Sequence, residues 1–261
     1  MKINLNRLKL WKKVILGFGT LFLLVTVTFF VWTRFIYVAD KVKLQQFFEQ
    51  NKNFLIINNH RQYWEIVSKN STCGTTNCVA TGFIFYPGAK IDPRAYFYKL
   101  DFLVNGSESN TKLFITKPPF HLAFFGINQA DKIIKNNPEI KNWILGGHSL
   151  GGAMSCEYVK SHTGKIKILV LLGAYCGSDM SDLDLKVVSI NGSLDGVLPL
   201  EKVSNNRKNL PQNNVGFVVD GMNHAQVGNY GDQSGDNFAR KSDDVVKKEI
   251  TAIFKTEIIG N

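Results

Sequence analysis

The sequence predicts an α/β fold in which a mostly parallel central sheet is flanked by helices and preceded by one N-terminal transmembrane helix. From residue 54 onward, strand patterns alternate with helix patterns, which is typical of a sheet covered on both faces. A glycine-rich turn at 146–152 joins an apolar strand to a helix. The 19 residues from 14 to 32 include no charged side chain. These three observations set the fold class.

The uncharged run predicts a membrane anchor, which we place at residues 14–33. A helix of this length is about 28 Å long, close to the hydrocarbon thickness of a bilayer. Trp11 and Trp32 flank the run, where aromatic side chains meet the membrane surface. The run is apolar on every side and lies at the extreme N-terminal end of the sequence, which together disfavour a helix buried in a soluble core. We therefore expect a lipid bilayer to be the partner of this segment.

Basic residues set the expected orientation of the anchor. Residues 1–39 contain six basic residues and no acidic one, and Lys12 and Lys13 directly precede the apolar run. This bias favours a cytoplasmic N-terminus and an extracellular main domain in the cell membrane. A cleaved signal peptide, which would release a secreted protein, is the alternative. The long apolar run, and the bulky Tyr37 two positions before Ala39, favour an uncleaved signal-anchor.

The expected domain organisation follows from these features. It comprises a basic cytoplasmic tail at 1–13, the anchor at 14–33, a polar stalk at 34–50 and a main domain at 51–261. The net charge is +10, but beyond residue 39 the chain has 25 basic and 21 acidic residues. The main domain is therefore only mildly basic. It lacks an Arg-rich helix or an RNP-like strand, so we expect no nucleic-acid partner.

The expected strands are runs of apolar or β-branched residues bounded by turn-forming residues. In chain order they are 54–58, 63–67, 79–86, 111–116, 143–146, 166–173, 187–192 and 215–219. The first two are close enough in sequence to form an antiparallel pair. The run 166–173 is continuously apolar, which is typical of a strand inside a parallel sheet.

The expected helices combine helical periodicity with recognisable start and stop residues. They lie at 39–50 in the stalk and within 92–105, 128–137, 149–161 and 242–259. Asp92 and Pro93 are a suitable cap and first residue for the second of these, and Pro138 ends the third. The segment 174–185 is too short to form a large lid, which predicts an open pocket.

Gly147, Ser149 and Gly151 form the pattern G-x-S-x-G between an expected strand and an expected helix. Such a turn is too tight for neighbouring side chains, so the serine hydroxyl stands free at the sheet edge. The N–H groups that begin the next helix can stabilise a negatively charged oxygen. The pattern therefore predicts Ser149 as a nucleophile. A serine that only caps a glycine-rich helix start is the alternative.

A serine nucleophile needs a general base, and the base needs an orienting carboxylate. Asp195 follows the strand 187–192 and His224 follows the strand 215–219, so a parallel sheet brings both to its carboxyl edge. We predict Asp195 as the acid and His224 as the base. Other side chains that could line the site or replace the acid are His121, Asp179, Asp182 and Asp220.

A developing oxyanion needs two donors. We expect the backbone N–H groups of Leu150, directly after the nucleophile, and of Ala89, in the turn after the strand 79–86. Lys90 beside this turn is either a solvated loop residue or an extra positive charge at the site. Neither a metal nor an organic cofactor is needed for this chemistry, and we expect none.

Four cysteines suit an exported protein. Cys73 and Cys78 bracket a turn-forming segment and could form a disulfide. A zinc site is disfavoured because no second ligand pair is evident. Cys156 and Cys176 are expected to be small buried hydrophobes, and whether they pair is left open.

The chain resembles the α/β-hydrolase superfamily over residues 54–259, and more narrowly its compact, lidless bacterial group related to dienelactone hydrolases. The matches are FYPGAKIDP at 85–93, GGHSLGGAM at 146–154, NGSLDG at 191–196, and NHAQ at 223–226 with YG at 230–231. The resemblance implies the α/β-hydrolase fold and a catalytic triad of Ser149, Asp195 and His224. It also implies Leu150 and Ala89 as oxyanion donors. Dienelactone hydrolases use cysteine at the position of Ser149, and this departure favours ester over lactone chemistry.

The expected function is that of a membrane-anchored, carboxylesterase-like serine hydrolase that cleaves small-molecule esters through an acyl-enzyme. Two other functions stay open. One is an acyltransferase that uses the same triad, and the other is a non-catalytic, anchored binding module on a hydrolase scaffold.

Overall fold

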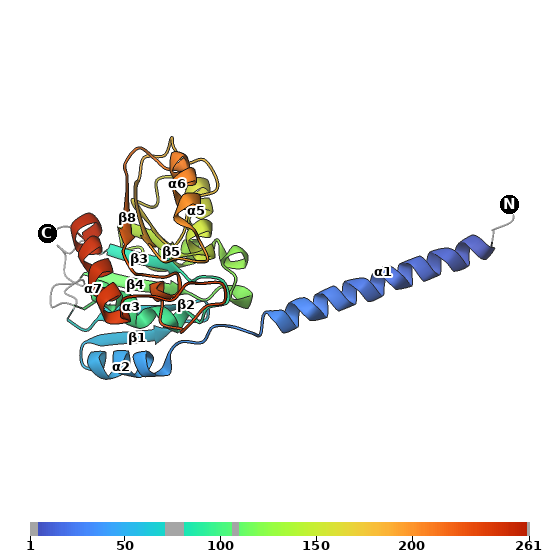
Figure 1. Cartoon of the computed structure of the whole chain (residues 1–261), viewed down its shortest axis with the longest axis horizontal. Coiled ribbons are helices and arrows are strands. Elements are labelled where there is room, and N and C mark those ends of the chain that lie inside the picture. The colour runs from blue at the N-terminus through green and yellow to red at the C-terminus, as the bar shows by residue number, and fades with distance from the viewer. Residues whose placement is uncertain (1–4, 71–80, 106–109, 260–261) are drawn as a thin grey trace. The chain divides into compact units, whose positions relative to one another are not determined.

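The computed structural model describes residues 5–70, 81–105 and 110–259. The chain forms two compact units, Met1–Ile36 and Tyr37–Asn261. Figure 1 labels their elements. The predicted fold class, a mostly parallel sheet flanked by helices, is confirmed in the second unit.

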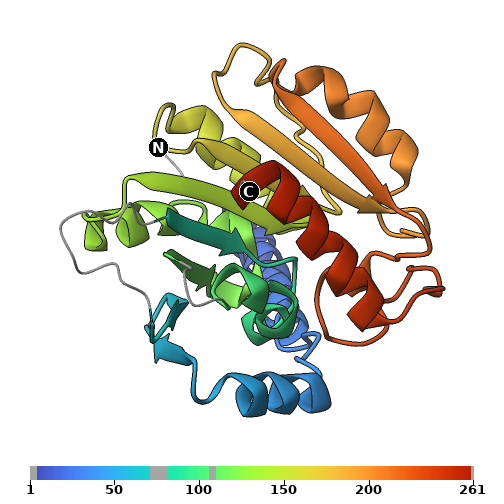
Figure 2. The ribbon, with the colours of Figure 1, turned by 90° about the vertical axis from the view of Figure 1, so that its left-hand side faces the viewer.

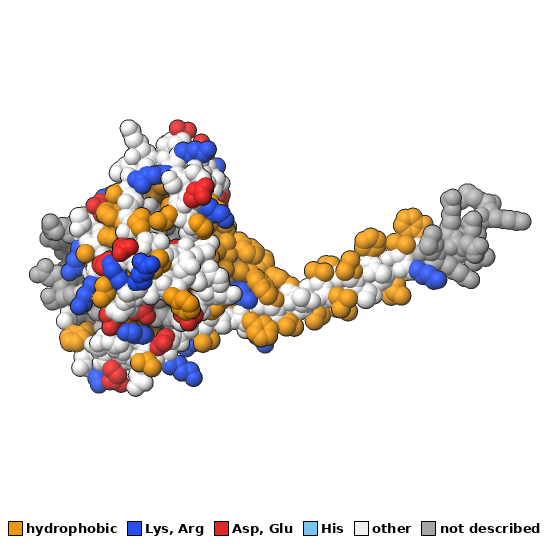
Figure 3. Space-filling model, in the orientation of Figure 1, with side chains coloured by type: hydrophobic (Ala, Val, Ile, Leu, Met, Phe, Trp, Pro, Cys, Tyr) orange, Lys and Arg blue, Asp and Glu red, His pale blue; other side chains and the backbone are white. Residues whose placement is uncertain are grey.

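The first unit contains a single long helix, α1 (Leu5–Trp32). Its 22 residues Trp11–Trp32 are long and apolar enough to cross a membrane, although a signal sequence has the same properties. Hydrophobic side chains are exposed along the helix in Figure 3. The hydroxyls of Thr20 and Thr26 donate to backbone carbonyls one turn earlier. Their polar groups are thus satisfied within the helix, as a bilayer interior requires.

The second unit is built on an eight-stranded sheet with the order β1-β2-β4-β3-β5-β6-β7-β8. The strands are β1 (Leu55–Asn59), β2 (Tyr63–Ser68), β3 (Thr81–Tyr86), β4 (Thr111–Thr116), β5 (Asn142–His148), β6 (Ile168–Leu172), β7 (Lys186–Gly192) and β8 (Asn214–Val219). The pairs β1–β2 and β2–β4 are antiparallel, and all the others are parallel. The predicted antiparallel opening pair is confirmed.

Two hydrophobic cores sandwich this sheet. One core contains residues of α2 (Lys41–Asn51), α3 (Phe97–Leu100) and α7 (Asp243–Phe254). The other contains residues of α4 (Gln129–Asn136) and α5 (Leu150–Ser161). Figure 2 shows α7 lying across the sheet. The central strands are buried on both faces, which explains why they are apolar along their whole length.

Two segments differ from the expected helices, and one helix lies outside the expected domain boundary. Residues 92–105 form a 3₁₀ turn, the short α3 and a second 3₁₀ turn instead of one helix, although Asp92 caps the start as expected. The helix α6 (Leu200–Asn206) is not predicted, because its short sequence is mostly polar. The predicted domain start at residue 51 leaves out α2. That helix packs on the second unit, since Phe47 is fully buried and its ring lies 5.3 Å from that of Phe97.

Candidate active site

Ser149 lies between β5 and α5 in a backbone conformation that residues other than glycine rarely adopt, with φ 52° and ψ −122°. It precedes α5 and is half-buried. The flanking glycines are required by close contact. A Cβ atom on Gly147 would overlap the backbone of Gly151, and one on Gly151 would overlap the backbone of Tyr86. The Ser149 N–H donates to the carbonyl of Leu172 at 3.1 Å. The turn therefore holds Ser149 in a strained position at the carboxyl edge of the sheet.

Asp195 and His224 are brought together from the loops after β7 and β8. The His224 Nδ1 atom lies 2.7 Å from Asp195 Oδ2, and both side chains are almost completely buried. The other carboxylate oxygen accepts the backbone N–H groups of Val197 at 3.0 Å and Leu198 at 2.6 Å. The His224 Nε2 atom is buried and has no hydrogen-bond partner among the described residues. The arrangement fixes the imidazole and leaves Nε2 for a further partner.

Gly173, directly after β6, connects this pair to the Ser149 turn. A Cβ atom at Gly173 would lie 3.1 Å from His224 Nδ1 and 3.4 Å from Asp195 Oδ2. Gly173 also lines the pocket that contains Ser149. The residues preceding Ser149 and Gly173 are paired across β5 and β6. Gly173 therefore lies beside the His224–Asp195 pair and lines the same pocket as Ser149, and the catalytic roles of the three residues stay a prediction.

The backbone N–H groups of Ala89 and Leu150 are the predicted oxyanion donors. Both residues are half-buried, and neither N–H donates to another group in the described part of the chain. The close approach of Gly151 to Tyr86 brings the loop after β3 against the start of α5. This contact brings the Ala89 loop to the same side of the sheet edge as Leu150. Lys90, next to Ala89, has a positive φ of 59°.

A buried hydrogen-bond chain beneath this loop involves Tyr96 and His148, to which the sequence analysis assigned no role. The Gly88 N–H donates to Tyr96 Oη at 2.9 Å, and Tyr96 Oη lies 2.9 Å from His148 Nδ1. The His148 ring centroid lies 4.5 Å from that of His224. Burial and the nearby His224 lower the pKa of His148 well below its ordinary value, and burial raises the pKa of Tyr96. His148 is therefore neutral, and its Nδ1 atom accepts a hydrogen bond from the Tyr96 hydroxyl.

Replacing Tyr96 with phenylalanine is expected to lower kcat by about tenfold, because a buried hydrogen bond to the Gly88 loop is lost. Tyr98→Phe is the matched control. The Tyr98 hydroxyl bonds Asp244 on α7, away from the site, so this variant should keep its kcat. Steady-state kinetics on an ester, the substrate class expected from the sequence, measure the effect. An unchanged kcat in Tyr96→Phe would show that the hydrogen bond does not position the loop.

The depressed pKa of His148 makes stability depend on pH. In the unfolded chain a histidine titrates near pH 6.5, whereas folded His148 stays neutral below that pH. The free energy of unfolding is therefore highest above about pH 6.5. It decreases as the pH is lowered further, by up to about 1.4 kcal/mol per pH unit. Urea unfolding at pH 7.5 and 5.5 measures this loss. We expect His148→Gln to lose less stability over this interval than the parent chain. An equal loss in both proteins would contradict this assignment.

Asp236 connects the loops that carry Asp195 and His224, the predicted acid and base. Its Oδ1 atom accepts the Gly196 N–H at 2.9 Å, and its Oδ2 atom accepts the Ala225 N–H at 2.8 Å. These two amides directly follow Asp195 and His224 in sequence. The sequence analysis missed Asp236, because it lies in an irregular segment outside any motif and its partners are distant in the chain.

The Asp236→Asn variant is expected to lower kcat about tenfold to a hundredfold, because an amide can accept only one of these two N–H groups well. Asp232→Asn, an exposed aspartate in the same segment, is the control and should leave kcat unchanged. Thermal unfolding measured in parallel separates loss of positioning from loss of fold. Full activity in Asp236→Asn would rule out a positioning role.

A pocket of about 430 Å³ opens beside Ser149. Its walls are mostly apolar and include Leu150, Met154, Ala174, Tyr175 and Leu198. Its acidic lining residue, Glu157, accepts the Ser178 hydroxyl at 2.6 Å. The pocket can therefore receive an uncharged, apolar group next to the serine hydroxyl.

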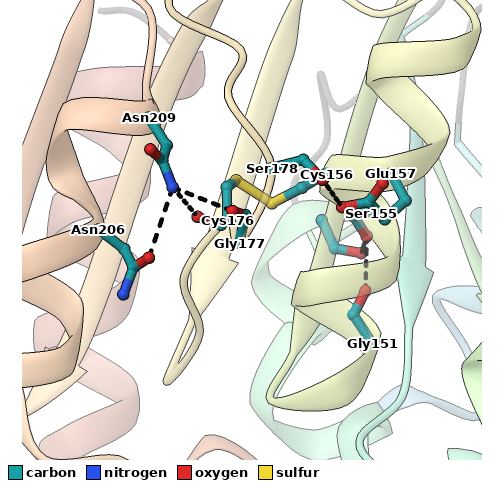
Figure 4. The surroundings of a disulfide bond; sticks show 10 residues. Gly151, Ser155, Cys156, Glu157, Cys176, Gly177, Ser178, Asn206 and Asn209 are labelled. Atoms are coloured by element: carbon teal, nitrogen blue, oxygen red, sulfur yellow. Dashed lines mark hydrogen bonds between the residues drawn. A yellow bond between two sulfur atoms is a disulfide. The ribbon is translucent and has the colours of Figure 1, made fainter.

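A disulfide between Cys156 and Cys176 fixes one wall of this pocket (Figure 4). Cys156 belongs to α5, and Cys176 follows β6 in the segment that includes Ala174 and Tyr175. The side-chain amide of Asn209 also donates to the carbonyl of Cys176 at 3.0 Å. The pairing left open by the sequence is thus found between these two cysteines. Cys73 and Cys78 lie outside the described residues.

The alternative candidates for acid and base have other contacts. Asp179 accepts the hydroxyl and N–H of Ser181, and Asp220 accepts the hydroxyl of Ser193. The carbonyl of His121 accepts the Lys90 N–H at 2.7 Å, which brings His121 beside the Ala89 loop. Among the residues that the structure describes, no group of three or more His, Cys, Asp or Glu side chains could hold a metal ion.

Comparisons with known proteins agree with this architecture. The sequence model of a family described as "Alpha/beta hydrolase family" matches residues 82–248. The fold is similar to Est1E from Butyrivibrio proteoclasticus, with a TM-score of 0.54 and 12% identity over 79% of this chain and 100% of that chain. It is also similar to an alpha/beta hydrolase enzyme from a lagoon-sediment metagenome from Mar Chica, Morocco (TM-score 0.53, 14% identity, 76% and 97% covered).

A third similar structure is a thermophilic esterase from Thermogutta terrifontis, with a TM-score of 0.51 and 10% identity over 67% of this chain and 89% of that chain. At these identities the three structures show a shared fold. A search of curated proteins finds no match.

Proposed function

The chain belongs to the alpha/beta hydrolase family, and we propose that it is a serine hydrolase that cleaves carboxylic esters. The family and the similarity to an esterase support hydrolase activity. One observation carries the finer proposal. His224 and Asp195, joined by a 2.7 Å hydrogen bond, lie beside Gly173, which lines the same pocket as the strained Ser149. A closer relation to dienelactone hydrolases stays a prediction.

The proposed reaction uses these groups in two steps. In the first, the Ser149 hydroxyl attacks the acyl carbonyl while His224 Nε2 takes its proton. The N–H groups of Leu150 and Ala89 stabilise the oxyanion, and the imidazolium of His224 returns the proton to the leaving alcohol. In the second step, His224 activates water, which hydrolyses the acyl-enzyme and regenerates Ser149. Asp195 holds the imidazole with Nδ1 protonated, so that Nε2 is free to accept protons.

The pocket beside Ser149 supports small or short-chain acyl groups. We expect the full-length chain in mild detergent to hydrolyse p-nitrophenyl esters, with kcat/KM highest for short acyl chains. An added alcohol tests the acyltransferase alternative. If the acyl ester of the alcohol forms faster than the free acid, the protein is an acyltransferase. If no ester is turned over above background, both proposals are wrong.

We further propose that α1 anchors the protein with its N-terminus in the cytoplasm and the catalytic unit outside. The apolar Trp11–Trp32 segment, the basic residues at its start and the disulfide Cys156–Cys176 support this orientation. Protease added to intact cells should then degrade the catalytic unit, which should co-sediment with membranes. A soluble secreted form that lacks the N-terminal segment would instead support signal cleavage.

A further inference from the structure

A second pocket, of about 210 Å³, lies beside α6. The helix α6 has no buried residue, and its apolar side chains Leu200 and Val203 line this pocket. Polar side chains also line it. Ser189 and Asn191 belong to β7, and Arg207 begins the 3₁₀ turn after α6. The pocket thus combines apolar walls with a small set of hydrogen-bonding groups, as ligand sites do.

The polar groups of this pocket have few partners of their own. Asn191 is only 3% exposed, and its side-chain oxygen is buried without a hydrogen-bond partner in the described part of the chain. Ser189 is 6% exposed. Arg207 takes part in none of the ion pairs formed by the described residues. Buried polar side chains normally have partners, so Asn191 is available to a ligand, whereas Arg207 is a solvent-exposed cation that can turn toward one.

Because Gly216 has no side chain, the Arg207 guanidinium can lie against β8 beside this pocket. A Cβ atom at Gly216 would lie 2.6 Å from Nη1 of Arg207 and 3.2 Å from Oγ of Ser189. The guanidinium therefore lies across β8, close to the Ser189 hydroxyl. Because Ser189 and Gly216 are paired between β7 and β8, these donors converge at one point on the sheet.

The pocket lies next to the pocket that contains Ser149, and the two share a wall. Ala174 and Tyr175 line both pockets. The residues before Ser149 and Asn191, His148 and Ile190, are each paired with Leu172 of β6. Asn191 therefore lies two strand spacings from Ser149, about 10 Å, and the Arg207 guanidinium about one spacing further. One elongated molecule can reach both.

We propose that the pocket beside α6 is a subsite for an anionic group, a carboxylate or a phosphate, on a substrate whose ester lies at Ser149. This inference rests on the proposed function. Arg207 supplies the paired N–H donors that such oxygens prefer. The Ser189 hydroxyl donates, and a half-turn of the Asn191 amide presents its NH₂ group. The apolar side chains Leu200 and Val203 pack against the chain that joins the anion to the ester.

A binding measurement tests the subsite without catalysis. The full-length Ser149→Ala variant in mild detergent is titrated calorimetrically with decanedioate and, separately, with octyl phosphate. We expect saturable binding of at least one probe, and the two titrations distinguish a carboxylate from a phosphate site. Introducing Arg207→Gln into the Ser149→Ala variant should weaken binding of the probe by about tenfold or more. Adding Lys208→Gln, a neighbouring exposed cation outside the pocket, should not.

Gly216→Ala is a second test, because the added methyl group would displace the Arg207 guanidinium and should weaken binding similarly. Thermal unfolding shows that each variant is folded. The proposal is overturned if neither probe binds, or if folded Arg207→Gln and Gly216→Ala variants bind as tightly as their parent.

A kinetic comparison links the subsite to the reaction. We expect kcat/KM to be higher for the mono-p-nitrophenyl ester of decanedioic acid than for p-nitrophenyl decanoate, and the ratio to fall about tenfold in Arg207→Gln. If neither ester is hydrolysed, the proposed function fails, while the titration still decides the subsite. If both esters react equally and the titration is negative, the subsite alone is wrong.

Discussion

The Ser149→Ala variant is expected to lose ester hydrolysis, with kcat/KM lowered by about 10⁴-fold or more. Alanine removes the attacking oxygen but leaves the glycine contacts of the turn, the Ala89 loop and the His224–Asp195 pair in place. The measurement is steady-state hydrolysis of a short p-nitrophenyl ester by the full-length chain. Ser161→Ala, at the far end of α5, is the matched control and should retain full activity.

A stability measurement makes this prediction sharper. Ser149 has φ 52°, a conformation that glycine adopts without cost and other residues adopt at about 1 kcal/mol or more. The Ser149→Gly variant should therefore be inactive and yet unfold at a higher temperature than the parent. An inactive variant with an unchanged or lower unfolding temperature would mean that the serine is not held under strain. Residual activity near that of the parent would exclude Ser149 as the nucleophile.

The Asp195→Asn variant is expected to lower kcat by about 10⁴-fold, the scale known for the equivalent change in a serine protease. The reason lies in the contacts of the carboxylate. One oxygen of Asp195 accepts the N–H groups of Val197 and Leu198, so the oxygen of an asparagine would take that side. Its NH₂ group would then face His224 Nδ1 and force the proton of the neutral imidazole onto Nε2. An imidazole with a protonated Nε2 cannot accept the proton of Ser149.

Asp220→Asn is the control for this change, since Asp220 is exposed and accepts the Ser193 hydroxyl. It should leave kcat close to that of the parent. NMR of the imidazole nitrogens reports the tautomer directly, and we expect Nδ1–H in the parent and Nε2–H in Asp195→Asn. A parent-like rate in Asp195→Asn, or the same tautomer in both proteins, would contradict the assigned role of Asp195.

Much of the fold could be predicted because local patterns determine it. The apolar strands at 166–173 and 187–192 have to be buried on both faces, and parallel strands then bring their carboxyl ends to one edge. The juxtaposition of Asp195 and His224 follows from this topology. The glycines around Ser149 likewise have a local cause, since the tight turn leaves no space for a Cβ atom.

The features that the sequence analysis missed depend on tertiary contacts. The Tyr96–His148 hydrogen bond joins residues 52 positions apart, and no periodicity or motif indicates it. Asp236 accepts hydrogen bonds from two loops that come together only in the folded chain. The pairing of Cys156 with Cys176 depends on how close α5 lies to the segment after β6, and this distance is set by the tertiary fold. The roles of Ala89 and Leu150 stay predictions, because an oxyanion hole is defined by the ligand that it binds.

The most direct test is covalent labelling of the full-length chain with a fluorophosphonate, followed by peptide mapping. An activated serine nucleophile should give one adduct, on the peptide that contains Ser149. We expect no adduct in Ser149→Ala and much slower labelling in Asp195→Asn. No labelling of the folded parent chain, or equal labelling of Ser149→Ala at another residue, would show that Ser149 is not an activated nucleophile.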